Sequence, residues 1–312
     1  MARLTYIGKR ILQMIFVLFV VTIFIFVLVR LIPGDPADIL MGDQATEADI
    51  QAYRVKMGLD QSIFVQFMEF LKGLVHLDFG NSLLYKVPCT EMVASKIMIT
   101  IKLTLVSIFF SLLISIPLGF AAGLHQDKAV DQIGRILSLL AISMPSFFVG
   151  LVLMIVFSVK LSWLPAGGWA EGFWGQFKSL LLPGFAQALM TAALLMRNLR
   201  NSVIEIKSKD YIDFANSKGL SNGRIRTAYI MKNSLVSTIT LLSTRIAYML
   251  GGSVVIESVF SLPGIGKLTA DAIFSRDYPM IQCLVFTFAV IVVVINLVND
   301  IVYSFIDPRI TL

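Results

Sequence analysis

Residues 210–235 read DYIDFANSKGLSNGRIRTAYIMKNSL and form the longest polar and basic stretch between two strongly apolar blocks. Residues 211–218 are expected to form a short helix in which Ala215 and Gly219 share one face, because they stand four residues apart. Gly219 suits the end of this helix, and Ser221 suits the N-cap of a second helix that runs into the following apolar block. The pattern predicts a helix–turn–helix elbow, and its two small residues predict a shallow spot that a partner's surface can approach closely.

The apolar blocks on either side of this stretch predict an all-α membrane protein. The chain is 57% hydrophobic and only 15% charged, whereas a soluble domain carries about 25% charged residues. Six apolar segments come close to or exceed the length of a membrane span, which is about 20 residues, and the fourth is broken near its start by Pro183-Gly184. The predicted spans are residues 11–32, 101–124, 136–158, 180–196, 236–259 and 282–304.

The distribution of charge predicts the side of the membrane on which each connecting segment lies. Segments 1–10, 125–135 and 197–235 and the tail after residue 305 together carry 14 Lys and Arg residues. By the positive-inside rule these segments, and with them both termini, are expected in the cytoplasm. Segment 33–97 carries nine acidic and five basic residues and is expected on the outer side.

These expectations divide the chain into four parts. Residues 1–32 are an N-terminal tail and first span, which is expected to be retained because its apolar run exceeds the about 7–15 residues of a signal peptide. Residues 33–97 form a small extracytoplasmic cap of short helices, and residues 98–305 form a five-span core. The core includes the cytoplasmic loop 200–235, and residues 306–312 are a cytoplasmic tail.

Two features inside the spans suggest a pathway or gate. Met144 and Pro145 lie in the third span, where proline kinks a helix and frees a backbone carbonyl. Arg245 lies deep in the fifth span, and burying it unpaired costs about 2.5–3.5 kcal/mol. We expect Arg245, with Tyr248 one turn away, to face a central pathway; the alternative is a buried pair between Arg245 and an acid of a partner subunit.

Several other function classes lack support in the sequence. Residues 264–269 faintly resemble a phosphate-binding loop, but Leu268 stands at the hydroxyl position, so the chain is not expected to hydrolyse ATP alone. The two cysteines and two histidines lack metal-ligand spacing, and no basic run interleaved with aromatics indicates nucleic-acid binding. The spans hold no pair of protease residues, and no inverted repeat marks a stand-alone ion-driven carrier, which stays the alternative from another class. A disulfide between Cys89 and Cys283 is left open.

Short motifs along the whole chain resemble one known family. Residues 213–215 (DFA), Gly219 and residues 231–235 (MKNSL) resemble the EAA loop of ABC importer permeases. The wider set resembles the permeases of dipeptide, oligopeptide and nickel importers: IPGDP at 32–36, GLD at 58–60, LDFGNS at 77–82, SMPSF at 143–147, GGSVVIE at 251–257, PGIG at 263–266, RDYP at 276–279 and DPR at 307–309. The chain departs from the pattern in reading DFA for EAA and in having Val236-Ser237 where the family often has a proline.

This resemblance implies the type I ABC importer permease fold and a non-catalytic subunit in the bacterial plasma (inner) membrane. The chain would be the first of two permease subunits, paired with a second, homologous permease. Two ABC ATPase subunits, which carry ATP and Mg, would bind below, and a substrate-binding protein would dock outside. In the family the EAA-loop helix inserts into a groove on the ATPase, and ATP-driven closure switches the spans between inward-open and outward-open states. The implied coupling residues are Tyr211, Asp213, Phe214, Ala215, Lys218, Gly219 and Leu220.

The implied cargo is a peptide or a nickel or metal-chelate species. Glutathione and an opine metallophore are the alternatives within the same architecture. Segments 157–166 and 276–283 favour nickel or metallophore members, although the binding protein is expected to carry the main selectivity.

Overall fold

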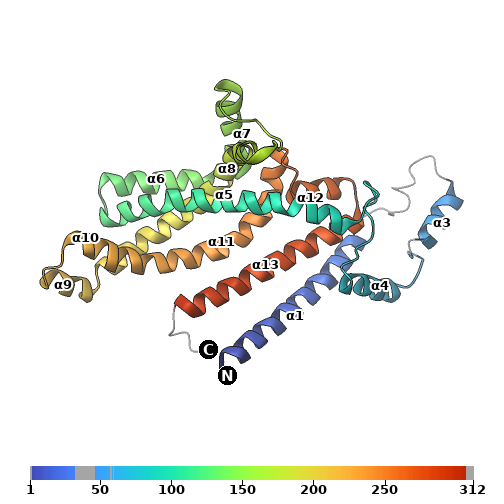
Figure 1. Cartoon of the computed structure of the whole chain (residues 1–312), viewed down its shortest axis with the longest axis horizontal. Coiled ribbons are helices and arrows are strands. Elements are labelled where there is room, and N and C mark those ends of the chain that lie inside the picture. The colour runs from blue at the N-terminus through green and yellow to red at the C-terminus, as the bar shows by residue number, and fades with distance from the viewer. Residues whose placement is uncertain (1, 32–45, 57, 59, 307–312) are drawn as a thin grey trace. The chain divides into compact units, whose positions relative to one another are not determined.

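The computed structural model describes residues 2–31, 46–56, 58 and 60–306 (Figure 1). The regular elements within these residues are all helices. The prediction of an all-α protein is therefore confirmed for this part of the chain. The IPGDP motif at 32–36, the Leu59 position of the GLD motif, the DPR motif and residues 307–312 of the predicted tail lie outside the described residues.

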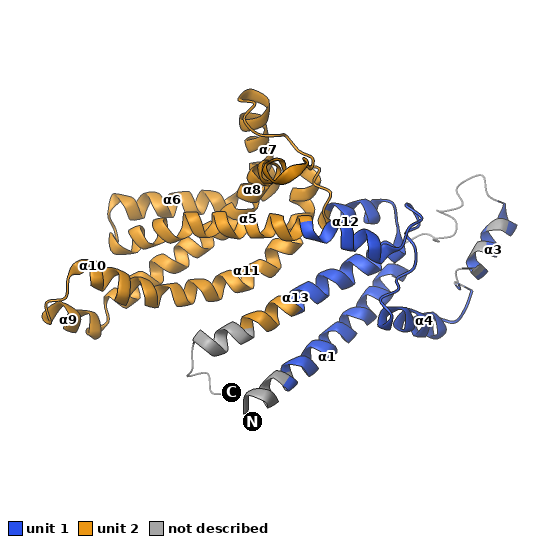
Figure 2. Ribbon diagram, viewed as in Figure 1, with its two compact units in different colours: residues 1–98, 267–293 blue, residues 99–266, 294–312 orange. Residues whose placement is uncertain are grey.

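The chain divides into two compact units (Figure 2). Unit 1 comprises residues 1–98 and 267–293, and unit 2 comprises residues 99–266 and 294–312. The helices, in chain order, are α1 Ala2–Leu31, α3 Glu47–Lys56, α4 Ile63–Val75, α5 Cys89–Leu124, α6 Ala129–Ser143, α7 Ser146–Leu153, η1 Met154–Lys160, α8 Gly172–Lys207, α9 Asp210–Ser217, α10 Asn222–Arg224, η2 Ile225–Met231, α11 Lys232–Val259, α12 Ile265–Phe274 and α13 Tyr278–Ile306.

The described helices account for the predicted spans. Five stretches are long and apolar enough to cross a membrane: Arg10–Leu31, Cys89–Leu124, Gly172–Lys207, Asn222–Val259 and Tyr278–Asn299. The remaining predicted span, residues 136–158, corresponds to the pair α6 and α7/η1, which is bent by 101° at Met144-Pro145. Short helices α3 and α4 occur in the predicted cap, while the side of the membrane on which they lie stays a prediction.

The bend between α6 and α7 follows from the residues at the break. Met144 ends α6 with an extended backbone, φ −89° and ψ 125°, as expected for a residue that precedes proline. Pro145 then caps the N-terminus of α7, where its missing N–H is not needed. The predicted kink is thus confirmed, but it is a break between two helices and not a bend within one.

Helix α8 is the central helix of unit 2. The predicted fourth span was expected to be broken at Pro183-Gly184, and this expectation is wrong, because α8 runs unbroken from Gly172 to Lys207. Of the apolar 18-residue stretch of α8, 72% is buried, which is a larger share than in the other four span-length helices. A Cβ on Gly184 would come within 2.6 Å of Val106 Cγ1 on α5, so the glycine permits close approach of these two helices.

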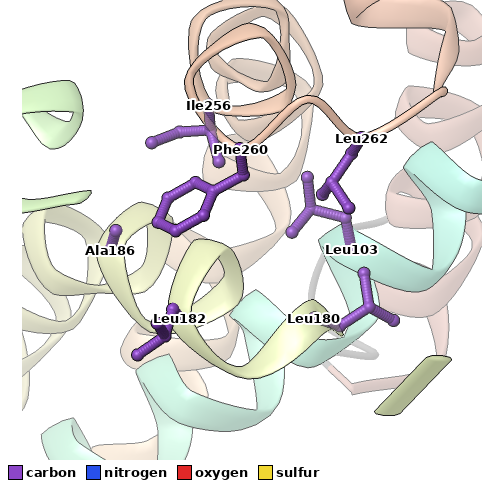
Figure 3. Close-up of a cluster of buried hydrophobic side chains, with 7 residues drawn as sticks. All are labelled: Leu103, Leu180, Leu182, Ala186, Ile256, Phe260 and Leu262. Carbon is purple, nitrogen blue, oxygen red and sulfur yellow. The ribbon is translucent and has the colours of Figure 1, made fainter. Parts of the chain in front are cut away.

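One apolar cluster joins α5, α8 and α11 (Figure 3). Leu103 of α5 meets Leu180, Leu182 and Ala186 of α8, together with Ile256, Phe260 and Leu262 in and after α11. Apolar burial drives little association in lipid, so the cluster contributes through close van der Waals packing. Glycine supports this fit at Gly150, where a Cβ would come within 2.9 Å of the Phe260 ring. The cluster holds these helices as one body, and the candidate site extends from the other end of α8.

Candidate functional site

The predicted elbow is present between α8 and α11. Helix α9 ends at Lys218-Gly219, and α10 and η2 follow and continue directly into α11. Gly219 has φ +74°, and the Leu220 N–H donates to Ala215 O at 3.3 Å while the Gly219 N–H donates to Asn216 O at 2.9 Å. This is the hydrogen-bond pattern of a Schellman cap, which places glycine in the left-handed region. The prediction that Gly219 ends the helix is confirmed; Ser221 is the N-cap of α10, but its side chain makes no capping bond.

The inner face of α9 belongs to a second apolar cluster. Ile212 and Ala215, three residues apart, pack with Leu199 and Val203 of α8 and with Ile225 and Ile230 of η2. Partly buried residues of α5, Phe120 and Leu124 among them, cover the same cluster. The elbow is therefore packed onto the helices that it connects.

The expectation of an open, shallow spot at Ala215 is wrong. Ala215 is only 3% exposed, and its small side chain fits α9 against its own chain. Gly219 is exposed and has open space where a Cβ would stand. The two small residues thus serve the fit and the ending of α9.

The outer face of α9 carries exposed aromatic side chains. Phe214 is 61% exposed and Tyr211 is 42% exposed, and Lys218 places its Nζ 4.6 Å from the centre of the Phe214 ring. Asp213 is exposed on the same short helix, whereas Leu220 is half-buried and contacts the cluster beneath. Two large rings are thus exposed beside charged side chains on one short helix. We call Tyr211, Phe214 and Lys218 the α9 outer face.

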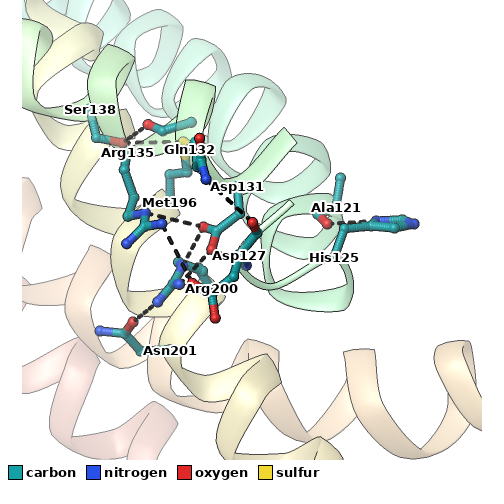
Figure 4. Close-up of polar contacts among 11 residues, drawn as sticks. Ala121, His125, Asp127, Asp131, Gln132, Arg135, Ser138, Met196, Arg200 and Asn201 are labelled. Atoms are coloured by element: carbon teal, nitrogen blue, oxygen red, sulfur yellow. Dashed lines mark hydrogen bonds and ion pairs between the residues drawn. The ribbon is translucent and has the colours of Figure 1, made fainter. Parts of the chain in front are cut away.

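An ion pair joins the first turn of α6 to α8 (Figure 4). Arg200 donates from Nε to Asp131 Oδ1 and from Nη2 to Asp131 Oδ2, both at 2.6 Å. Asp131 is completely buried, and it also accepts a bond of 2.9 Å from the Asp127 N–H. Arg135 lies farther off, with its Nε 3.8 Å from Asp131 Oδ1. This Asp131–Arg200 clasp fixes the start of α6 against α8 one turn before the Val203 contact with α9.

Sequence reasoning missed the clasp because it treated Arg135 and Arg200 only as charges that set orientation. Asp131 was the available signal, since an acid in the first turn of a helix within a basic segment has cations within reach.

A second buried carboxylate was missed as well. Glu257 of α11 is completely buried and accepts a bond of 2.6 Å from Thr100 Oγ1, which in turn accepts from the Ile265 N–H at 3.0 Å. A Cβ on Gly264 would meet the carboxylate of Glu257, and a Cβ on Gly266 would approach it to 2.9 Å. The GGSVVIE and PGIG motifs are therefore the two sides of one contact.

The predicted pathway residues form two local pairs. Arg245 is half-buried on α11, and its guanidinium carbon lies 5.2 Å from the centre of the exposed Tyr248 ring. Met144 and Pro145 lie exposed at the break between α6 and α7. Among the described residues no ion pair to Arg245 and no hydrogen bond between the two pairs is formed, so their common role stays a prediction.

The described residues contain no group of three or more His, Cys, Asp or Glu side chains that could hold a metal ion. Cys89 and Cys283 are both buried and are free thiols.

Comparison with known proteins places almost the whole chain within one group. Residues 115–312 match the model of a binding-protein-dependent transport system inner membrane component, and residues 3–104 match the model of the N-terminal part of such a membrane component.

Similar proteins and a similar solved structure point the same way. The chain is 35% identical over 307 residues to a glutathione transport system permease protein of Salmonella choleraesuis, covering 98% of this chain and 99% of that protein. It is 36% identical over 305 residues to a putative peptide transport system permease protein of Brucella suis, covering 97% of each. A chain of the MetNI methionine ABC transporter, solved in inward-facing conformations, superposes with a TM-score of 0.55 at 15% identity, covering 70% of this chain and 97% of that one, which indicates a shared fold.

Proposed function

This chain belongs to the family of binding-protein-dependent transport system inner membrane components, and we propose the part that it plays in such a system. It is a membrane permease subunit of an ABC importer. We infer that it pairs with a second, similar permease around a central pathway. ATP and Mg bind on two partner ATPase chains, and a substrate-binding protein delivers cargo from the outer side. Both termini lie in the cytoplasm, as the charge distribution predicts.

The α9 outer face is the surface on which an ATPase partner docks. The observation that carries this proposal is the contrast between the two sides of one short helix. Phe214 is 61% exposed, while Ala215 beside it is 3% exposed and packed on α8 and η2. An aromatic anchor surrounded by charge is typical of the few residues that dominate binding energy at an interface. Because the inner side is packed, a displacement of α9 is passed to α8 and α11 at once.

The Asp131–Arg200 clasp extends this coupling to a third helix. Arg200 stands on α8, within one turn of Val203, which contacts the α9 cluster. Motion of the lower end of α8 therefore carries the start of α6 with it. The break at Met144-Pro145 lies at the far end of α6, where such motion can be absorbed as a hinge.

Peptides are the cargo that the relatives favour. Similar proteins are named as peptide and glutathione permeases, and glutathione is itself a small peptide. Nickel or metal-chelate cargo stays a prediction from the sequence alone. We propose that Arg245, with Tyr248 beside it, faces the pathway, where a cation can meet the carboxylate of a peptide. The alternative is an ion pair between Arg245 and an acid of the partner subunit, and an Arg245 variant distinguishes the two.

The docking proposal is tested by co-purification. The chain is co-expressed with its ATPase chains, and Phe214→Ala is compared with Phe173→Ala, which removes a ring that is 76% exposed at the N-terminal end of α8. Loss of a hot-spot ring costs about 2 kcal/mol or more, which weakens binding about 30-fold. In Phe214→Ala the ATPase chains should therefore no longer co-purify and uptake should be lost, while the yield of the permease chain stays unchanged. Retention of both ATPase and uptake in Phe214→Ala refutes the docking proposal.

A further inference from the structure

Helix α4 presents an apolar stripe that the rest of its unit leaves uncovered. Phe64 is 71% exposed and Val75 is 81% exposed, and Met68 between them is exposed too. Offsets of four and seven residues place these side chains on one face of the helix. Glu69 is exposed on a different side, and Lys72, four residues after Met68, is exposed at the edge of the stripe. The helix is thus amphipathic, and much of its apolar side is left exposed by its own unit.

The neighbouring side of α4 is fixed to the C-terminal turns of α1 (Figure 1). The Phe67 ring lies 5.0 Å and the Phe70 ring 5.8 Å from the Phe26 ring, measured between centroids. Arg30 covers the same Phe26 ring at 3.4 Å and donates from Nη2 to Gln66 Oε1 at 2.6 Å. Both helices belong to unit 1, so these contacts set the height of α4 along α1.

That height corresponds to the edge of a bilayer. Arg10–Leu31 is long and apolar enough to span a membrane. Phe26 stands five residues before Leu31, which is about 7.5 Å along the helix axis at 1.5 Å per residue. An amphipathic helix that lies in a membrane surface buries its apolar side about 5–10 Å into the boundary between headgroups and acyl chains. The α1 contact therefore holds α4 at the depth at which such helices lie.

The surroundings of the contact agree with lipid as the occupant. At the same level α1 exposes the apolar side chains of Phe24, Leu28 and Leu31, so the span still presents an apolar surface at the height of α4. Arg30 and Lys72 place cations near this level, where long basic side chains can reach the headgroups.

We propose that α4 is a membrane-surface helix whose Phe64, Met68 and Val75 side chains insert into the bilayer where α1 leaves it. Together α1 and α4 then form one anchor, with one helix crossing the membrane and the other lying in its surface. The anchor holds the following segment, which leads into α5, at a fixed depth.

The proposal is tested with spin labels on single introduced cysteines. Phe64→Cys, Met68→Cys and Val75→Cys are compared with Glu69→Cys on the other side of the same helix. The natural cysteines Cys89 and Cys283 are buried, and the unmodified chain, labelled in parallel, measures their background. The full chain, with the subunits that co-purify with it, is placed in nanodiscs of phosphatidylethanolamine and phosphatidylglycerol. Collision rates are measured with oxygen, which concentrates in lipid, and with a water-soluble nickel chelate.

The expected result is a ratio of oxygen to nickel collisions several-fold higher at positions 64, 68 and 75 than at 69. Equal, water-like ratios at all four positions would show that the stripe faces solvent and would overturn the proposal. Low collision rates with both reagents at 64, 68 and 75, with immobilised labels, would show that another protein chain covers the stripe and would overturn it equally. Three labelling positions on one face ensure that loss of a single variant leaves the comparison intact.

Discussion

Removing the arginine of the Asp131–Arg200 clasp should destabilise unit 2 strongly. In Arg200→Met the two bonds of 2.6 Å to Asp131 are lost while the carboxylate stays completely buried. Breaking a buried pair by removing one partner costs about 3–5 kcal/mol, because an uncompensated charge remains. Arg135 already lies 3.8 Å from the same carboxylate and can supply part of the missing charge. The expected loss of stability therefore lies at the lower end, about 3 kcal/mol.

The matched control and the double variant separate charge from packing. Arg135→Met removes a cation whose side chain is 48% exposed, and exposed pairs contribute only about 0–1 kcal/mol. Asp131→Asn combined with Arg200→Met removes both charges and should recover most of the loss, because no unpaired charge is left. Stability is measured by titrating the purified chain from mild detergent into SDS and following helix content. If Arg200→Met unfolds at the same SDS fraction as Arg135→Met, the clasp does not hold the helices as described.

Three further variants test other contacts. Gly264→Ala should lower the free energy of unfolding by about 1–3 kcal/mol in the same titration, because its methyl group meets the buried Glu257 carboxylate. Gly251→Ala, with open space around its Cβ, should not lower it. Equal behaviour of the two variants would contradict the packing described. Gly219→Ala should lower the free energy of unfolding by about 1–2 kcal/mol because φ is +74° there, and Gly219→Asn should lower it less. An unchanged unfolding free energy in Gly219→Ala would show that the turn is not held in the left-handed region. Arg245→Met should lower the uptake of peptide or change the number of ATP molecules hydrolysed per peptide transported. Normal transport with unchanged coupling would show that Arg245 does not act in the pathway. Loss of pairing between the two permeases would favour the alternative of an inter-subunit ion pair.

The helices were accessible from the sequence because lipid imposes a simple rule. Apolar runs of span length fix where helices must form, and the described helices cover all six predicted segments. The sharpness of the break at Pro145 was not accessible, because a proline permits a range of bends and the neighbouring helices select one. Pro183 shows the opposite outcome, since α8, packed against α5 and α11, continues without a break through a residue that usually interrupts a helix.

The candidate site was predictable where chemistry is local. Gly219 ends α9 because the turn needs positive φ, which can be read from the residue type. The direction in which Ala215 points cannot be read in this way, because periodicity shows which residues share a face and not what that face contacts. Asp131 and Arg200 stand 69 positions apart, and Thr100 and Glu257 stand 157 apart. Such pairs depend on how the helices associate, which no local pattern specifies.

The central claim is that the outer face of α9 is seated on a partner ATPase. The most direct measurement places a photo-activated cross-linking amino acid at position 214 in the assembled complex, with position 173 as the control. The account predicts a cross-link from position 214 to the ATPase and none from position 173. A position 214 that cross-links only to lipid, to the substrate-binding protein or to the second permease would contradict it.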